Sequence, residues 1–455
     1  MTHFDLAVIG TGSGNMILDD RFADQRAAIV EQGRFGGTCL NVGCIPTKMF
    51  VHPADLAREA GHAGRLGVDL RLDGVRWRAI RDRVFGRIDP IARDGRRYRE
   101  GQDNVTVYPG HGRFIGERTL VVTVDGAEHE VSADRVVIAA GSRVTLPDID
   151  GLADVPHHTS DTVMRLEELP RRMVIVGGGF VGAEFAHVFS SYGVQVTQLH
   201  RGPRLLGHHD EDVADRFTRL AARQWEVRLD TTVTAASRRR EQTVLRLSDG
   251  TELATDVLLL ATGRRPNTDL LRVERAGVEV DQDGVILVDD QQRTTADGVW
   301  ALGDIASHHQ LKHVANFQAR VVRHNLLHPE DPISSRREAV PHAVFSSPQV
   351  AAVGLTEQEA RASGTPYVSA VQEYGDVAFG WAMEDTTHFA KVLADPETRL
   401  LLGGHVIGPQ ASTLIQPLVQ AMSLGEAVDR VARGQYWIHP ALTEVVENAL
   451  LHLPG

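Results

Sequence analysis

Apolar runs that lead into glycine-rich turns are the clearest pattern along this chain. The first run, Phe4 to Ile9, predicts a strand that ends in the turn Gly10-Thr11-Gly12-Ser13-Gly14-Asn15. A helix should follow this turn, and the next apolar run, Ala27 to Val30, predicts a second strand that ends at Glu31. The order strand, glycine-rich turn, helix, strand is typical of the first unit of a dinucleotide-binding domain.

The same pattern returns in the middle of the chain. Val174 to Val176 predicts a strand, Gly177-Gly178-Gly179-Phe180-Val181-Gly182 a turn, and the segment from Ala183 a helix. The strand that follows, Val194 to Leu199, completes the unit. Two copies of this unit in one chain predict two bound dinucleotides with different roles.

Three further apolar runs predict additional strands of these two units. Val136 to Ser142 closes the first unit with a turn at Gly141, and Leu258 to Arg264 closes the second with a turn at Gly263. Val299 to Ile305 then returns to the first domain and presents Asp304 in a Gly-Asp turn, where simple turn chemistry is the alternative to ligand binding.

The glycine and proline punctuation near residues 332–341 predicts a third domain from residue 336 to the end, with strands at 343–345, 389–393 and 401–407. We therefore predict an α/β protein with two Rossmann-like dinucleotide-binding domains and a C-terminal α/β domain. The expected boundaries are 1–145 with 268–335 for the first domain, 146–267 for the second and 336–455 for the third.

Composition narrows the class of protein. With 455 residues, 42% hydrophobic and 24% charged, the chain is long enough for about three domains. A net charge of −12 without a basic run disfavours nucleic-acid binding, and the absence of an apolar run of ~18 residues predicts no membrane span. Because a strand begins at Phe4, we expect no signal peptide and a cytoplasmic protein.

The glycines of the two turns explain how each would hold its dinucleotide. Gly10, Gly12 and Gly14 allow the backbone to approach a pyrophosphate, and Glu31 can accept hydrogen bonds from ribose hydroxyls. Asn15 departs from the usual third glycine, so close helix packing is less assured there.

In the second copy Gly177, Gly179 and Gly182 are all in place. Its last strand leads into Arg201 and Arg204, where an acidic residue would select NAD. Two arginines suit a 2′-phosphate and predict NADPH, although solvated arginines are the simpler alternative in a chain with many arginines.

The chain has only two cysteines, Cys39 and Cys44, and both lie in one glycine-rich segment after the first unit. Such a pair can carry two electrons as a dithiol and a disulfide; the simpler alternative is two inert buried thiols. A zinc site is disfavoured because no further ligand flanks the pair, so we predict no metal. A disulfide needs Cα atoms within about 4.4–6.8 Å, so the segment cannot be undistorted helix, and a bridge over so short a stretch should be labile.

Lysine is rare here, with only Lys48, Lys312 and Lys391. Lys48 lies four residues after Cys44, one helical turn on, so both can face the same partner. A compact ammonium cannot be replaced there by arginine.

Four features of the chain combine: the cysteine motif, the second glycine-rich turn, the strand with its Gly-Asp turn, and the late segment His439-Pro440-Ala441-Leu442-Thr443-Glu444. With these features the chain resembles the FAD-dependent pyridine nucleotide-disulfide oxidoreductases over essentially its whole length. The resemblance implies a glutathione reductase-like fold with a C-terminal dimerisation domain. It places Glu31 on the adenosine ribose, Thr38 near the cofactor and Asp304 on the ribityl chain. It also implies that Lys48 lies by the flavin and pairs with Glu184.

The resemblance also implies a mechanism. Electrons would pass from NADPH through FAD to a Cys39–Cys44 disulfide, with Cys44 nearer the flavin and Cys39 attacking the substrate disulfide. His439, oriented by Glu444, would supply the proton to the departing thiolate from the partner subunit of a homodimer. Phe180 would cover the nicotinamide pocket, with core packing as the alternative.

The predicted site residues fall into two sets. The catalytic residues are Cys39, Cys44, His439, Glu444, Lys48 and Glu184. The cofactor-binding residues are Gly10, Gly12, Gly14, Glu31, Gly37, Thr38, Lys48, Gly141, Asp304, Gly177, Gly179, Gly182, Arg201, Arg204 and Gly263.

Alternatives remain within the family. Four stretches, at residues 13–15, 85–90, 374–385 and 434–440, indicate a branch that reduces a sugar-linked small disulfide, which nothing in spacing or charge specifies. Dihydrolipoamide dehydrogenase should prefer NAD, and the missing acid at the strand end counts against it. Glutathione reductase stays possible because Arg320 lies where that enzyme holds a carboxylate. Mercuric reductase and the large thioredoxin reductases are disfavoured because the last residues hold no cysteine pair. A non-catalytic FAD-binding protein is the remote alternative.

Overall fold

The computed structural model describes residues 1–454, which form two compact units. The first unit comprises Met1–Thr47, Ala79–Thr145 and Gly263–Arg336. The second comprises, among the described residues, 48–78, 146–262 and 337–454. Two helices, α2 (Cys44–His62) and α3 (Trp77–Glu100), contribute residues to both units.

The first unit is built on a seven-stranded sheet in the order β3-β2-β1-β6-β5-β4, with β16 paired to β6. Its strands are β1 (Thr2–Ile9), β2 (Ala27–Val30), β3 (Val105–Tyr108), β4 (His111–Gly116), β5 (Thr119–Val124), β6 (Ala127–Ile138) and β16 (Val299–Ala301). The strands β1, β2, β3, β6 and β16 pair in parallel, whereas β4, β5 and β6 form an antiparallel meander. The unit also contains the short pair β7 (Ser142–Val144) and β15 (Arg264–Pro266) and the helices α1 (Gly37–Asn41), α6 (Thr268–Leu271) and α7 (Lys312–Leu327).

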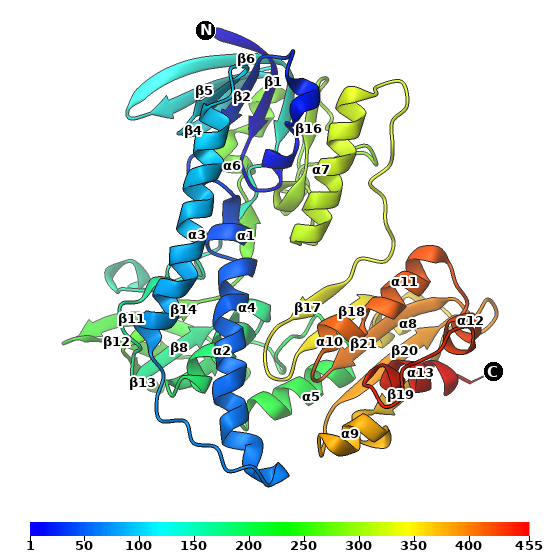
Figure 1. Ribbon diagram of the computed structural model, residues 1–455. Helices are drawn as coiled ribbons and strands as arrows, with labels where there is room; N and C mark the ends of the chain where they lie inside the picture. The colour runs from blue at the N-terminus through cyan, green and yellow to red at the C-terminus, as the bar shows by residue number, and fades with distance from the viewer. Residues whose placement is uncertain (455) are drawn as a thin grey trace. The chain divides into compact units, whose positions relative to one another are not determined.

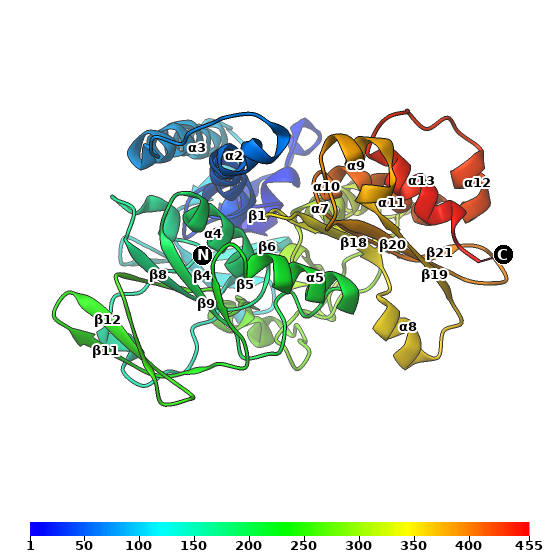
Figure 2. The same cartoon turned by 90° about the horizontal axis from the view of Figure 1, so that it is seen from below.

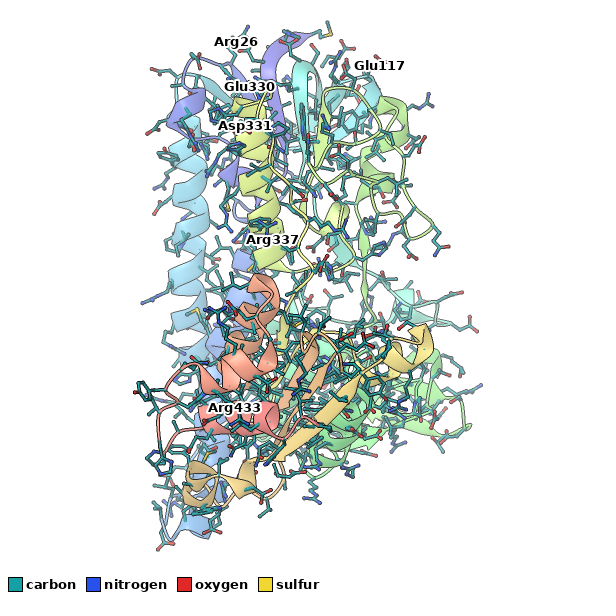
Figure 3. All side chains as sticks on the ribbon, turned by 90° about the vertical axis from the view of Figure 1, so that its right-hand side faces the viewer. Arg26, Glu117, Glu330, Asp331, Arg337 and Arg433 are labelled. Carbon is teal, nitrogen blue, oxygen red and sulfur yellow. The ribbon has the colours of Figure 1, made fainter. Side chains whose placement is uncertain are left out.

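Both faces of this sheet are buried because alternate residues of its strands point to opposite sides. On one side Leu6 and Val8 of β1 pack with Ala319 and Val322 of α7, and Figure 1 shows α7 running beside the strands. On the other side Ala7 and its neighbours pack against the meander. Figure 3 labels Glu330 and Asp331 at the C-terminal end of α7.

The sequence predicts a helix after the first glycine-rich turn, and this prediction is wrong. Between β1 and β2 the chain forms only two 3₁₀ turns, Gly14–Met16 and Asp20–Phe22. One cause is local, because the Asp19 side chain caps the second turn by accepting from the Arg21 amide at 3.1 Å. A second cause is tertiary. The side chains of Arg99 and Arg323 donate hydrogen bonds to backbone carbonyls of residues 15–18, which in a helix would accept from backbone amides.

The second unit contains a four-stranded parallel sheet in the order β10-β9-β8-β14. Its strands are β8 (Arg172–Val176), β9 (Gln195–Leu199), β10 (Glu226–Arg228) and β14 (Val257–Leu260), and an antiparallel sheet is formed by β11 (Val233–Arg239), β12 (Gln242–Leu247) and β13 (Glu252–Thr255). The helices here are α4 (Phe180–Ser191) and α5 (Glu211–Ala221). The helix predicted from Ala183 thus begins three residues earlier.

The same unit ends in a five-stranded antiparallel sheet in the order β17-β18-β21-β20-β19. Its elements are β17 (His342–Val344), β18 (Val350–Gly354), β19 (Val368–Glu373), β20 (Phe389–Ala394), β21 (Leu401–Ile407), α8 (Glu357–Ser363), α9 (Ala378–Ala382), α10 (Ala411–Leu414), α11 (Gln416–Leu424), α12 (Val428–Arg433) and α13 (Thr443–Leu451). Figure 2 shows α10, α11 and α13 on one face of this sheet and α8 on the other. Leu414, Leu418 and Val446 join Val392 and Val406 in the core between sheet and helices.

The α/β class predicted from the sequence is confirmed, while the three domain boundaries remain predictions. Among residues 1–454 no helix is long and apolar enough to cross a membrane.

Candidate active site

The first glycine-rich turn needs glycine where the chain packs against β6 and its following residues. Gly10 has a φ of 99°, and a Cβ there would lie 2.3 Å from the Ala139 carbonyl oxygen. A Cβ at Gly14 would lie 2.7 Å from the Ala139 Cβ. At Gly12, by contrast, the nearest atom to such a Cβ would be the Gly37 Cα at 3.8 Å, an ordinary contact that leaves the backbone there uncrowded. The uncrowded backbone at Gly12 fits the approach of a pyrophosphate.

Glu31 holds this turn in place. One oxygen, Oε2, accepts from the Thr11 amide at 2.8 Å and from the Thr11 hydroxyl at 2.6 Å. The other oxygen accepts from the Gly33 amide at 2.7 Å. The sequence did not single out Thr11, whose hydroxyl also accepts from the Gly36 amide at 3.2 Å. The predicted contact of Glu31 with a ribose remains a prediction.

Asp304 is fixed by a short polar chain within the first unit. Its Oδ2 accepts from the Ser142 hydroxyl at 2.8 Å, and that hydroxyl accepts from the Arg264 Nε at 2.9 Å. Gly141 and Gly263, at the two predicted turns, have positive φ angles of 63° and 107°. This arrangement leaves the other carboxylate oxygen of Asp304 available to a ligand hydroxyl.

The cysteine segment is irregular, as its spacing predicts. Cys39 lies in the five-residue helix α1 and Cys44 begins α2, and the chain between them leaves helical geometry at Val42, where φ is −144°. Gly37 is required at the start of α1, because its φ is 64° and a Cβ would lie 2.7 Å from the Gly12 Cα. The cysteine helix therefore packs directly on the first glycine-rich turn.

The two cysteines are present as thiols that share a hydrogen bond. The side chain of Cys44 is exposed and that of Cys39 is half-buried. The hydrogen bond to Cys44, burial and the negative charge of Cys44 raise the pKa of Cys39, whereas the nearby Lys312 opposes the rise. One thiolate shared by the pair is therefore easier to form than two. The disulfide form remains a prediction.

Lys48 and Glu184 form the predicted pair within the second unit. The Lys48 Nζ lies 2.8 and 2.7 Å from the two carboxylate oxygens of Glu184, whose side chain is 4% exposed. Glu184 also accepts from the Phe345 amide at 2.9 Å, and the ammonium lies 4.6 Å from the centre of the Phe345 ring. Phe345 was missed in the sequence because it is 161 residues from Glu184, and no local pattern marks it.

The second glycine-rich turn has regular geometry. A Cβ at Gly177 would lie 2.1 Å from the Ala261 oxygen, and one at Gly182 would lie 2.4 Å from the Gly177 oxygen. Gly179 has no atom within 4 Å of a built Cβ, so its backbone is open to a ligand. The helix α4 starts at the next residue, Phe180, whose side chain is 52% exposed. Exposure favours the predicted lid over core packing for Phe180.

The two arginines after β9 differ in their surroundings. Arg201 is exposed. Arg204 lies 3.1 Å from both Glu211 and Asp215 of α5, so a 2′-phosphate would have to compete with two carboxylates for it. Arg201 is therefore the stronger candidate for the NADPH phosphate.

His439 and Glu444 are paired as expected. The His439 Nδ1 lies 2.7 Å from the Glu444 Oε1, and the other carboxylate oxygen accepts from the Ala441 amide at 3.2 Å. The His439 side chain is 71% exposed whereas that of Glu444 is 17% exposed. Glu444 thus fixes the ring while Nε2 is left to face outward.

Each unit gathers part of the predicted site. The first brings together the residues Gly10, Gly12, Gly14, Glu31, Gly37, Thr38, Cys39, Cys44, Gly141, Gly263 and Asp304. The second holds the residues Lys48, Gly177, Gly179, Gly182, Glu184, Arg201, Arg204, His439 and Glu444. The backbone is uncrowded at Gly12 and open at Gly179, which fits the approach of a dinucleotide at both turns.

Comparison with known proteins shows which families the chain matches and which proteins it is similar to. Residues 4–319 match the family described as pyridine nucleotide-disulphide oxidoreductase, and residues 340–450 match the dimerisation domain of that family. The chain is 54% identical over 460 residues to a mycothione reductase from Mycobacterium tuberculosis, with all of both chains covered. It is 32% identical over 479 residues to a dihydrolipoyl dehydrogenase from Corynebacterium glutamicum, covering 100% of this chain and 98% of the relative.

A solved structure of a disulfide reductase has a similar fold. The HOCl-induced flavoprotein disulfide reductase RclA from Escherichia coli superposes with a TM-score of 0.86 at 30% identity, covering 98% of this chain and 99% of that chain.

Proposed function

The chain belongs to the pyridine nucleotide-disulphide oxidoreductase family, and from that premise we propose that it uses NADPH to reduce mycothione, the disulfide of mycothiol. The family makes it an FAD-dependent disulfide oxidoreductase with the glutathione reductase-like fold. Its dimerisation domain supports a homodimer, and its substrate is a disulfide. We further propose that it works in the cytoplasm.

The reaction balances with one electron pair. NADPH and a proton convert one substrate disulfide into two thiols and NADP⁺. When bound, FAD supplies the electron-pair transfer between NADPH and the cysteine pair. The residues of the first glycine-rich turn, with Asp304, would hold FAD, and those of the second turn, with Arg201, would hold NADPH.

The cysteine pair carries out the exchange with substrate. Because the pKa of Cys39 is raised, Cys39 gives its proton to His439 as it attacks one substrate sulfur, which forms a mixed disulfide and releases the first thiolate. The Cys44 thiolate then attacks the Cys39 sulfur, which forms the Cys39–Cys44 disulfide and releases the second substrate thiolate, and this thiolate takes up the second proton. The hydrogen bond between the Cys39 and Cys44 side chains favours this second step, because the resolving Cys44 already contacts the Cys39 sulfur.

His439 supplies the proton. A departing thiolate leaves more readily when an imidazolium protonates it, and the 71% exposure of His439 leaves Nε2 accessible from outside its own subunit. We assign this role in trans, to the His439 of one subunit acting on the cysteines of the other.

The observation that carries mycothione as the substrate is the 54% identity, over the full length of both chains, to a protein named mycothione reductase. The four stretches at residues 13–15, 85–90, 374–385 and 434–440 also resemble that enzyme rather than its relatives. Exposed Arg201 in the place of an acid favours NADPH over NADH and so counts against dihydrolipoamide dehydrogenase.

The test is a comparison of kcat/KM for mycothione, glutathione disulfide and lipoamide, each with NADPH and with NADH. We expect the combination of mycothione and NADPH to exceed every other by at least about tenfold, which is ~1.4 kcal/mol of transition-state discrimination. A preference for lipoamide with NADH would overturn the proposal. An Arg201→Glu variant should lose NADPH preference, with the exposed Arg223→Glu as the charge-matched control.

A further inference from the structure

The segment after the first glycine-rich turn lacks the helix that usually favours a bound pyrophosphate. It forms the three-residue turn Gly14–Met16, whereas the second copy continues into the twelve-residue helix α4. A helix start contributes positive potential from its aligned peptide dipoles. The first turn must therefore obtain that potential, and its fixed shape, from another source.

Arg99 occupies the carbonyls that a helix would have used. From the C-terminal end of α3, its Nη2 donates to the carbonyl oxygens of Asn15 at 2.6 Å and Leu18 at 2.9 Å. Its Nε donates to the Asn15 side-chain oxygen at 2.8 Å, and its Nη1 to Gln102 at 2.9 Å. Four of its five N–H groups are thus used on neutral oxygens.

The charge of Arg99 is buried and lacks a carboxylate partner among residues 1–454. The residue is only 5% exposed, and burial lowers its pKa. The carboxylate whose charge acts on Arg99, that of Asp19, is already paired with Arg21 at 2.5 Å and Arg323 at 3.2 Å. A buried cation normally has an anion beside it, because its desolvation is otherwise uncompensated.

Two cations of α7 hold the same segment from the other side. The Lys312 Nζ donates to the Ser13 hydroxyl at 2.9 Å, and that hydroxyl donates to the Asn316 side-chain oxygen at 3.0 Å. The Arg323 Nη1 donates to the Met16 carbonyl at 3.2 Å. Ser13, Asn15 and Met16 therefore each accept a hydrogen bond from a cationic side chain.

We propose that Arg99 is a positioning residue for the FAD diphosphate: acting through Asn15, it fixes the unwound fingerprint turn and supplies the positive potential that the missing helix would have given. Four of the five N–H groups of Arg99 are engaged by the turn, Leu18 and Gln102, so the residue acts on the phosphates through the turn. The proposal explains why Asn15 stands at the third glycine position, because its side chain is a ligand of Arg99. It rests on FAD binding at the first turn but not on the identity of the disulfide substrate.

The test measures binding to the folded apoprotein. FAD affinity is measured by flavin fluorescence for wild-type protein, Arg99→Met and the control Arg97→Met, whose residue lies on the same helix and pairs with Asp94 at the surface. ADP and adenosine are then titrated as competitors of FAD. We expect Arg99→Met to weaken FAD and ADP by about tenfold and to leave adenosine unchanged, because only the diphosphate senses the lost potential.

A purely structural role gives a different result. Equal losses for ADP and adenosine, or FAD and ADP affinities within about twofold of wild type, would overturn the proposal. If Arg99→Met does not yield folded apoprotein, Asn15→Ala decides the matter, because it keeps the charge and removes one hydrogen bond. It should weaken ADP about threefold and spare adenosine, and an unchanged ADP affinity would refute the assignment.

Discussion

Glu184 sets the charge balance around Lys48. Its carboxylate takes both hydrogen bonds from the ammonium and is almost completely buried. Glu184→Gln leaves a cation beside a neutral amide, so we expect the protein to lose about 1–3 kcal/mol of stability. Urea unfolding of the FAD-bound protein measures the loss.

The control is a double-mutant cycle. Lys48→Met leaves the Glu184 carboxylate buried and unpaired, so this single change should cost more than Glu184→Gln. The double variant should recover part of the loss because no lone charge remains. Strictly additive losses would contradict the pairing.

Residue roles could be predicted from the sequence when they belong to a motif. The pairs Lys48–Glu184 and His439–Glu444 were expected from the resemblance, and both lie within hydrogen-bonding distance. Phe345 and Arg99 were not foreseen, because each acts on residues more than 80 positions away. Only the folded chain brings such segments together.

At the scale of elements, α1 and the first glycine-rich turn depend on each other at Gly37 and Gly12. A Cβ at Gly37 would lie 2.7 Å from the Gly12 backbone and would need a φ of 64°. We expect Gly37→Ala to destabilise the apoprotein by about 1–3 kcal/mol, measured as a lower thermal midpoint.

Gly12→Ala provides the matched comparison. A Cβ there would meet the Gly37 Cα at 3.8 Å and so would fit without strain, but it would stand on the backbone that the pyrophosphate is expected to approach. The apoprotein should therefore keep nearly wild-type stability while FAD affinity falls by about tenfold or more. Equal loss of apoprotein stability in both variants would contradict this account of the turn.

Acid should destabilise the second unit through His209. This residue is 7% exposed, its ring lies 4.8 Å from that of His342, and burial with neighbouring histidines lowers its pKa to about 3. The unfolded chain binds the proton more readily, so the stabilising contribution is complete above about pH 6.5 and is lost as pH falls toward 3. At pH 5 the loss should be about 2 kcal/mol.

Urea unfolding at pH 7 and pH 5 checks this dependence. His405, 1% exposed and with its pKa also lowered by burial, acts in the same direction, so His209→Gln should reduce the difference without removing it. The exposed His62→Gln variant should match wild type. A wild-type stability that does not change between the two pH values would contradict the prediction.

Strands could be predicted more reliably than helices here. β2 spans Ala27–Val30 as expected from its apolar run, and β21 spans Leu401–Ile407. The helix expected after the first turn does not form, because arginines from distant helices bind its carbonyls. Apolar runs indicate burial in a sheet, whereas a helix also depends on which groups donate hydrogen bonds to its backbone carbonyls.

At the scale of the whole molecule, the proposed homodimer has active sites that each combine the cysteines of one subunit with His439 of the other, and this arrangement can be tested. Cys39→Ser and His439→Gln homodimers should each be inactive. If His439 acts in trans, a heterodimer of the two has one intact site, so an equal mixture that exchanges subunits should regain roughly a quarter of wild-type activity. Activity that stays at the level of the separate variants would contradict a shared site.

The fold class of the whole chain followed from its hydrophobic pattern, and its chemistry followed from combined motifs. No single motif was sufficient, since the first fingerprint departs from the rule at Asn15. The substrate could not be predicted from the spacing and charge of residues in the sequence, because mycothione and other small disulfides present the same sulfur–sulfur bond to the cysteines. Similarity over the full length of a relative supplied that step.

The most direct test of the central claim counts thiols. Because the chain has only Cys39 and Cys44, alkylation followed by mass spectrometry reports the pair without ambiguity. The oxidised FAD-bound protein should take up no label when denatured. After one equivalent of NADPH per subunit without oxygen it should take up two labels, and after excess mycothione none again. Two labels on the oxidised protein, or no gain with NADPH, would contradict the account.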